Sequence, residues 1–171
     1  VAAEPDVVKP MNLSFDDRGR LLVTSSLEYP FPAKPGLTPR DTVKILEDFG
    51  PDGRARKIST FADGLNIPIG VTATSDGAIV HGIPKVWKFS DADGDGKAEA
   101  RSALYGDVGQ RDTHGMVNGF TPWVDGWIYA CHGFANDSRI SAEKGGGSIH
   151  MVSGNTWRMK ADGSALQHYS R

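Results

Sequence analysis

The chain has 171 residues, a formal net charge of −2 and ordinary apolar content, which together predict one packed domain spanning residues 1–171. The charge excludes the strongly basic surface that binds nucleic acid or anionic lipid. No apolar run approaches the roughly 18–20 residues that a membrane helix needs. We therefore expect no nucleic-acid partner and no membrane span in this chain.

The single cysteine excludes an internal disulfide. A start at Val1 rather than at a methionine favours a processed or trimmed N-terminus.

Glycine and proline punctuate the chain from end to end, with 21 and 10 copies, which predicts many short strands and few helices. Three segments align with one another: "PMNLSFDDRGRLLV" (Pro10–Val23), "PIGVTATSDGAIVH" (Pro68–His81) and "VNGFTPWVDGWIYA" (Val117–Ala130). Each has two β-rich halves around a turn glycine, which supplies the positive φ of a tight hairpin. The glycines recur at intervals of roughly 50 residues, close to the length of one propeller blade.

A second repeated unit follows each of these hairpins. "VKILEDFGPDGRA" (Val43–Ala55) resembles "VWKFSDADGDGKA" (Val86–Ala98), and "TWRMKADGSA" (Thr156–Ala165) is a shortened copy. Each reads as a strand followed by an acidic, glycine-bearing turn. Between the second and the third of these segments, "ISAEKGGGSIH" (Ile140–His150) is predicted to be a polar, glycine-rich loop.

The two units together predict an all-β chain of about three blades of four-stranded antiparallel sheet. Because a closed propeller has about four to eight blades, we interpret the chain as a partial β-propeller, a fragment of a longer chain or one that completes its ring by association. The alternative is a small independent β-sandwich.

The loop "DADGDGKAE" carries alternating carboxylates at Asp91, Asp93 and Asp95. Calcium takes six to eight oxygen ligands, and Lys97 (through its carbonyl) and Glu99 extend the set. The glutamate at position twelve of an EF-hand is missing, so we predict a calcium loop of another kind. The alternative is a solvated acidic turn.

His114 lies in "RDTHG", just before the third hairpin. Ligands of propellers sit at the mouth of the channel that the innermost strands line, and a histidine there is a candidate base near neutral pH. Arg111 and Asp112 are placed to tune it or to bind an anion. The alternative is a histidine that caps a turn, and the residues alone favour this reading for both His114 and His132.

Five stretches in this order resemble one family: "FADGLNIPIGV", "DADGDGKAEA", "THGMVNGF", "DGWIYACHGFANDS" and "SGNTWRMKADGS". It is the membrane-bound dehydrogenase family of planctomycetes and related bacteria, whose haem-binding members carry a C-x-x-C-H motif. These proteins are distantly similar to the soluble glucose and sorbosone dehydrogenases, which use pyrroloquinoline quinone and calcium. The resemblance covers nearly the whole chain and is more specific for the propeller than for the activity.

The resemblance implies site residues. In the sugar dehydrogenases, a histidine of an Asp-His motif ahead of a "DG-x-[IL]-Y" strand takes the proton of the substrate hydroxyl. His114 matches this place ahead of "DGWIY", although Thr113 separates it from Asp112. His114 and Asp112 are thus the implied catalytic pair, and Arg111 and Asn118 the candidate cofactor-binding residues. The cations that hold the quinone in that family lie in later blades, and haem belongs to a region absent from this chain.

The sequence therefore gives two hypotheses. In the first, the chain is part of an exported, periplasmic dehydrogenase-like propeller that oxidises a sugar or alcohol, partnered by the remainder of the propeller or by an electron-accepting haem domain. In the second, it is a non-catalytic propeller that binds carbohydrate or a protein partner, with Trp123 or Trp127 stacking on sugar rings.

Overall fold

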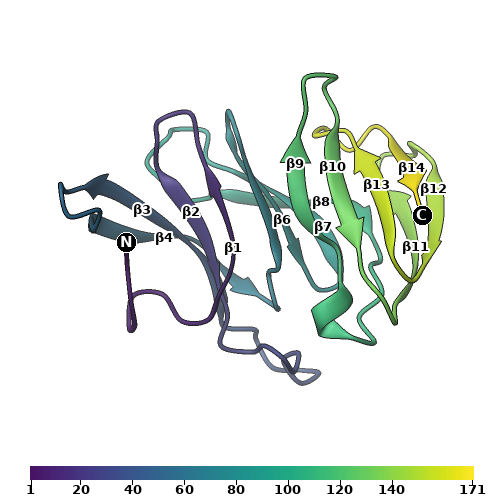
Figure 1. The fold of residues 1–171 in the computed structure, drawn as a ribbon, viewed down its shortest axis with the longest axis horizontal. Coiled ribbons are helices and arrows are strands. Elements are labelled where there is room, and N and C mark those ends of the chain that lie inside the picture. Colours follow the sequence, from purple (N-terminus) through teal and green to yellow (C-terminus); the bar gives the residue numbers. More distant parts are fainter.

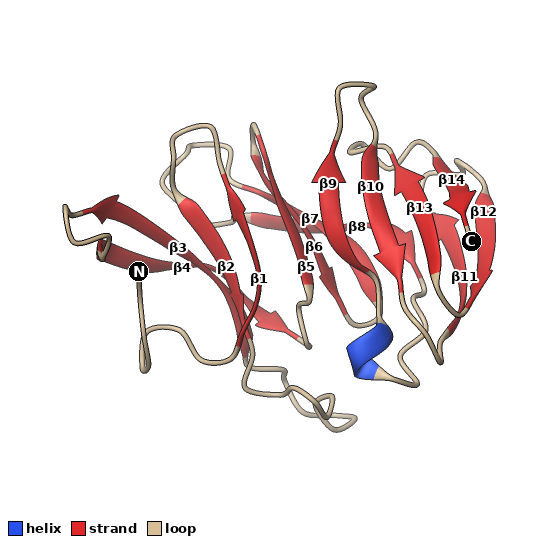
Figure 2. Ribbon diagram, in the orientation of Figure 1, coloured by secondary structure: helices blue, strands red, loops and turns tan.

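The computed structural model describes all residues 1–171 as three antiparallel sheets that follow one another in a curved row (Figures 1 and 2). Blade 1 contains β1 (Pro10–Phe15), β2 (Leu21–Ser25), β3 (Asp41–Phe49) and β4 (Ala55–Leu65). Blade 2 contains β5 (Gly70–Thr74), β6 (Gly77–Gly82), β7 (Lys85–Ser90) and β8 (Ala100–Gly106). Blade 3 contains β9 (Asn118–Pro122), β10 (Ile128–His132), β13 (Asn155–Met159) and β14 (Leu166–Ser170). The partial β-propeller predicted from the repeats is confirmed.

The predicted repeat corresponds to the hairpins β1–β2, β5–β6 and β9–β10. Their turn glycines have positive φ, 75° at both Gly19 and Gly126 and 139° at Gly77. At Gly77 a side chain is also excluded by space, because a Cβ there would lie 2.2 Å from the carbonyl oxygen of Phe89. The glycines are thus required by the turns that define each blade.

One segment differs from the prediction. The residues read as a glycine-rich loop form a hairpin, β11 (Asp137–Ala142) and β12 (Ser148–Val152), which is inserted between β10 and β13. It pairs with blade 2, through Ser141 opposite Gly106 and Ala142 opposite Tyr105, so the middle sheet has six strands. The alternation of exposed and buried residues along β11 explains the strand, and the glycines occupy only its turn.

Two apolar clusters fill the spaces between neighbouring blades. Fifteen buried residues, with Trp157 and Tyr105 among the largest, lie mainly between blades 2 and 3, and ten lie between blades 1 and 2. Successive residues of β6 supply both, since Ile79 belongs to the first cluster and Val80 to the second. This follows from a strand whose side chains alternate between two covered faces.

The N-terminal segment covers the outer face of blade 1, where Val7 packs with Leu21, Val23 and Leu46. The only helical element is η1, a single 3-10 turn at Thr113–Gly115 between β8 and β9. None of the chain's elements is a helix of the length and apolarity that crossing a bilayer requires.

Candidate functional site

Three connections meet at one end of the molecule, the lower end in Figure 1: β2–β3, β8–β9 with η1, and β10–β11. The Thr113 hydroxyl donates to the carbonyl oxygen of Pro30 at 2.7 Å. The ring of Tyr29 stands edge-on to that of His114, with centroids 5.3 Å apart. Blade 1 and the entry to blade 3 are therefore joined here, around a hollow of about 450 Å³ lined in part by Arg111, Asp112 and His114.

His114 and Asp112 form the pair that the sequence suggested. Nδ1 of His114 lies 2.9 Å from Oδ1 of Asp112, and the same oxygen accepts the backbone N–H of His114 at 2.9 Å. These hydrogen bonds to His114 hold the pKa of Asp112 below its usual range. The His114 side chain is 61% exposed, so Nε2 is free to meet a ligand while Nδ1 is held by the carboxylate.

Asn136 fixes the backbone of Asp112, a role that was not predicted from the sequence. Its Oδ1 accepts the N–H of Asp112 at 3.1 Å and its Nδ2 donates to the carbonyl oxygen of Asp112 at 2.8 Å. Asn136 is buried. A side chain that hydrogen-bonds to the backbone of a residue distant in the sequence leaves no pattern of spacing, so only the fold could identify this role of Asn136.

Replacing Asn136 with alanine should lower the free energy of unfolding by about 1–3 kcal/mol, because the N–H of Asp112 loses its partner and the carbonyl oxygen of Asp112 keeps only the N–H of Gly115. Urea denaturation measures this change. Asn118→Ala is the control, because Asn118 is only part-buried and makes one side-chain hydrogen bond, to the carbonyl of Met116. Equal stability of Asn136→Ala and the parent protein would contradict the role given to Asn136.

His132 is a structural residue, in agreement with the preferred reading. It is buried on β10, where Nδ1 lies 2.7 Å from the carbonyl oxygen of Ser153 and Nε2 lies 2.7 Å from the hydroxyl of Ser138. Ser138 in turn accepts the N–H of Gly109 at 2.8 Å. Since a carbonyl only accepts, Nδ1 carries the proton. Both nitrogens are engaged, which leaves neither for a substrate.

The residues present fit only part of a quinone site. Arg111 is the one cationic side chain lining the hollow beside His114, and Asp112 next to it carries the opposite charge. Asn118 lies at the start of β9 with its amide turned to Met116. An anionic quinone needs several cations, and this chain does not gather them. The assignment of Arg111 and Asn118 to a cofactor stays a prediction.

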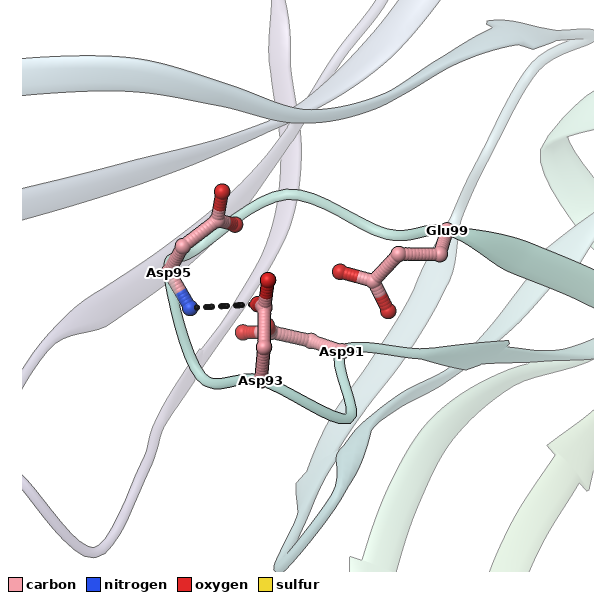
Figure 3. Close-up of side chains that lie close together, drawn as sticks. All are labelled: Asp91, Asp93, Asp95 and Glu99. Carbon is pink, nitrogen blue, oxygen red and sulfur yellow. Dashed lines mark hydrogen bonds between the residues drawn. The ribbon is translucent and has the colours of Figure 1, made fainter.

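The acidic loop brings four of its five predicted ligand residues together (Figure 3). One carboxylate oxygen from each of Asp91, Asp93, Asp95 and Glu99 lies within 4.8 Å of the others. Glu99 closes the loop by accepting the N–H of Ala92 at 3.0 Å. Lys97 donates its N–H to Asp95 at 2.8 Å, and a role for its carbonyl stays a prediction.

A larger cleft lies elsewhere in the molecule. It lies between blades 1 and 2 and has a volume of about 810 Å³. Its walls include Thr60–Gly64 of β4 and Lys97–Arg101 at the end of the acidic loop. We give the His114 end more weight for chemistry, because it combines an exposed imidazole with an anion that orients it, whereas the larger cleft holds no such pair.

A profile of the family described as "Domain of unknown function (DUF7133)" matches residues 1–171. The chain belongs to the DUF7133 family. The match covers all three blades and both candidate sites.

The DUF7133 domain is also similar to the large ribosomal subunit protein uL3 of Deinococcus radiodurans. The two are 27% identical over 115 residues, which is 67% of this chain and 53% of uL3. The chain thus matches about half the length of that curated relative.

Proposed function

We propose that this DUF7133 domain is part of an exported propeller related to the planctomycete membrane-bound dehydrogenases, and that it contributes the proton acceptor for oxidation of a sugar or alcohol. The observation that carries the proposal is the 2.9 Å contact between Nδ1 of His114 and Asp112. A carboxylate on one imidazole nitrogen leaves the other as an oriented base. The sequence match of "THG" ahead of "DGWIY" supports the same assignment.

In this mechanism the Nε2 atom of His114 takes the proton of the substrate hydroxyl. Asp112 keeps the ring in the required tautomer and stabilises the imidazolium that forms. Tyr29 limits the rotation of the ring from the side. A bound quinone would supply the acceptor for the hydride. The further cationic side chains that bind the quinone would come from outside the hollow beside His114.

The test of this proposal is dye-linked oxidation of a panel of sugars and secondary alcohols by the intact protein, supplied with pyrroloquinoline quinone and calcium. The proposal expects turnover that depends on both the quinone and one class of hydroxyl substrate. Dye reduction that is the same with and without substrate, from protein shown to be folded, would reject it.

A second function is favoured by one feature, the tip of the β9–β10 hairpin. It projects from the end of the molecule opposite η1 (Figure 1) and carries Trp123 and Val124, which are 61% and 93% exposed. An exposed indole is suited to stacking on a sugar ring or to packing on a protein partner. Trp127 is not free in this way, since Arg158 and Lys160 both lie over its ring.

The two functions are separated by Trp123→Ala. Loss of glycan or partner binding in this variant, with binding retained in His114→Ala, would favour the non-catalytic propeller. A ribosomal role is not proposed, because a net charge of −2 lacks the basic footprint of a protein that binds ribosomal RNA.

A further inference from the structure

We propose that the loop from Asp91 to Glu99 binds one calcium ion, and that this ion clamps blade 2 onto blade 1. The site is distinct from the His114 end and independent of the proposed dehydrogenase function. The argument begins from Asp91, which the fold buries, and not from the number of acidic residues alone.

Asp91 lies at the end of β7 and is only 7% exposed. Its Oδ2 accepts the N–H of Gly96 at 3.1 Å, but its Oδ1 is buried without any hydrogen-bond partner. A buried carboxylate oxygen without a donor is strongly unfavourable unless a cation or a water molecule satisfies it. Figure 3 shows the Asp91 carboxylate pointing toward Asp93 and Asp95, so the unsatisfied group belongs to the cluster.

None of the four carboxylates of the cluster forms an ion pair within the chain. The ten ion pairs of the chain engage other carboxylates, and none includes Asp91, Asp93, Asp95 or Glu99. Four like charges whose oxygens lie within 4.8 Å repel one another unless a cation stands between them.

The number of carboxylates favours calcium over magnesium. Ligands on opposite sides of Ca²⁺ are about 4.6–5.2 Å apart, twice the metal–oxygen distance, and those of Mg²⁺ about 4.0–4.2 Å. The four oxygens lie within 4.8 Å of one another, which the calcium sphere accommodates, and four carboxylates exceed the one or two that Mg²⁺ usually takes. Three of the four carboxylates are exposed, so water can complete the six to eight ligands that calcium takes.

The same loop is held to blade 1 by two hydrogen bonds. Nη1 of Arg18, in the β1–β2 turn, donates to the carbonyl oxygen of Gly94 at 3.0 Å. The N–H of Ala98 donates to the carbonyl oxygen of Phe61, on β4, at 2.8 Å. An ion that fixes the positions of residues 91–99 therefore also fixes both contacts between the blades.

The experiment is a calcium titration of the EDTA-stripped intact protein by calorimetry, with thermal unfolding followed in EDTA and in calcium. We expect one ion per chain and a rise in Tm of roughly 5–10 °C when free calcium is about 100 times the Kd.

Asp91→Asn should weaken calcium binding at least tenfold. If Asp91→Asn does not fold, the surface variant Asp93→Asn/Asp95→Asn should also weaken binding, and its Tm in EDTA should be at or above that of the parent, because repulsion is relieved.

The matched control is Asp52→Asn, in the equivalent turn of blade 1, where Asp52 pairs with Arg56. Its calcium response should equal that of the parent.

Hydrogen exchange tests the clamp. Calcium should slow exchange at Gly96 and Ala98 and also in the Asp16–Arg20 turn of blade 1, but not in the β13–β14 turn. Absence of binding heat with identical Tm in EDTA and calcium, or an equal Tm shift in magnesium, would overturn the calcium site. Unchanged exchange in blade 1 would overturn the clamp.

Discussion

Replacing His114 with alanine should lower the turnover of sugar or alcohol oxidation by the intact protein by about 10²–10⁴-fold, the range that a positioned general base contributes. The loss should fall on kcat, because His114 takes the hydroxyl proton during reaction. The side chain is largely exposed and its hydrogen-bond partner is Asp112 alone. Thermal unfolding should therefore be nearly unchanged.

Two variants control this result. His150→Ala removes another exposed histidine, on β12 and paired with Asp137, and should leave turnover as in the parent protein. Asp112→Asn keeps an oxygen for the backbone N–H of His114 but no longer fixes the tautomer, and should lose turnover by a smaller factor than His114→Ala. Full activity in His114→Ala would remove the base assignment.

The second large effect is an acid sensitivity caused by His81. This side chain is fully buried on β6 with neither ring nitrogen hydrogen-bonded, and burial lowers its pKa from 6.5 to about 3. Above pH 6.5 both folded and unfolded chains hold the ring neutral. As the pH falls toward 3, only the unfolded chain takes up a proton, so the free energy of unfolding decreases by about 1.4 kcal/mol per pH unit, up to about 5 kcal/mol.

Urea denaturation of the parent protein and of His81→Leu at pH 7 and pH 4.5 measures this effect. The parent should lose about 2–3 kcal/mol more than the variant over this interval. Other groups that titrate in acid, such as Asp112, are common to both proteins and cancel in the difference. Equal losses in the two proteins would show that His81 is protonated in the folded chain or already solvated.

The local features of the fold were predictable from the sequence. Each blade hairpin is closed by a glycine whose positive φ is a local requirement, and the repeat of these turns indicates the number of blades. The spacing of Asp91, Asp93 and Asp95 likewise predicts their meeting, because a short turn alone brings them together.

Features that depend on packing between sheets were not predictable in this way. The β11–β12 hairpin pairs with β8 across a gap of roughly 30 residues, and nothing in the residues around Gly145–Gly147 indicates that partner. His81 lies on the same face of β6 as Ile79, which packs between blades 2 and 3, so its burial depends on the docking of these two blades. The hydrogen bonds from Asn136 to Asp112 depend on the meeting of two distant connections.

The most direct test of the proposed function is an optical titration of the intact protein with pyrroloquinoline quinone in the presence of calcium, followed by addition of substrate. The proposal predicts saturable binding of the quinone and its reduction by a sugar or alcohol, with reduction but not binding lost in His114→Ala. A folded protein that leaves the quinone spectrum unchanged at every concentration would contradict it and would favour a propeller that binds carbohydrate or a protein partner.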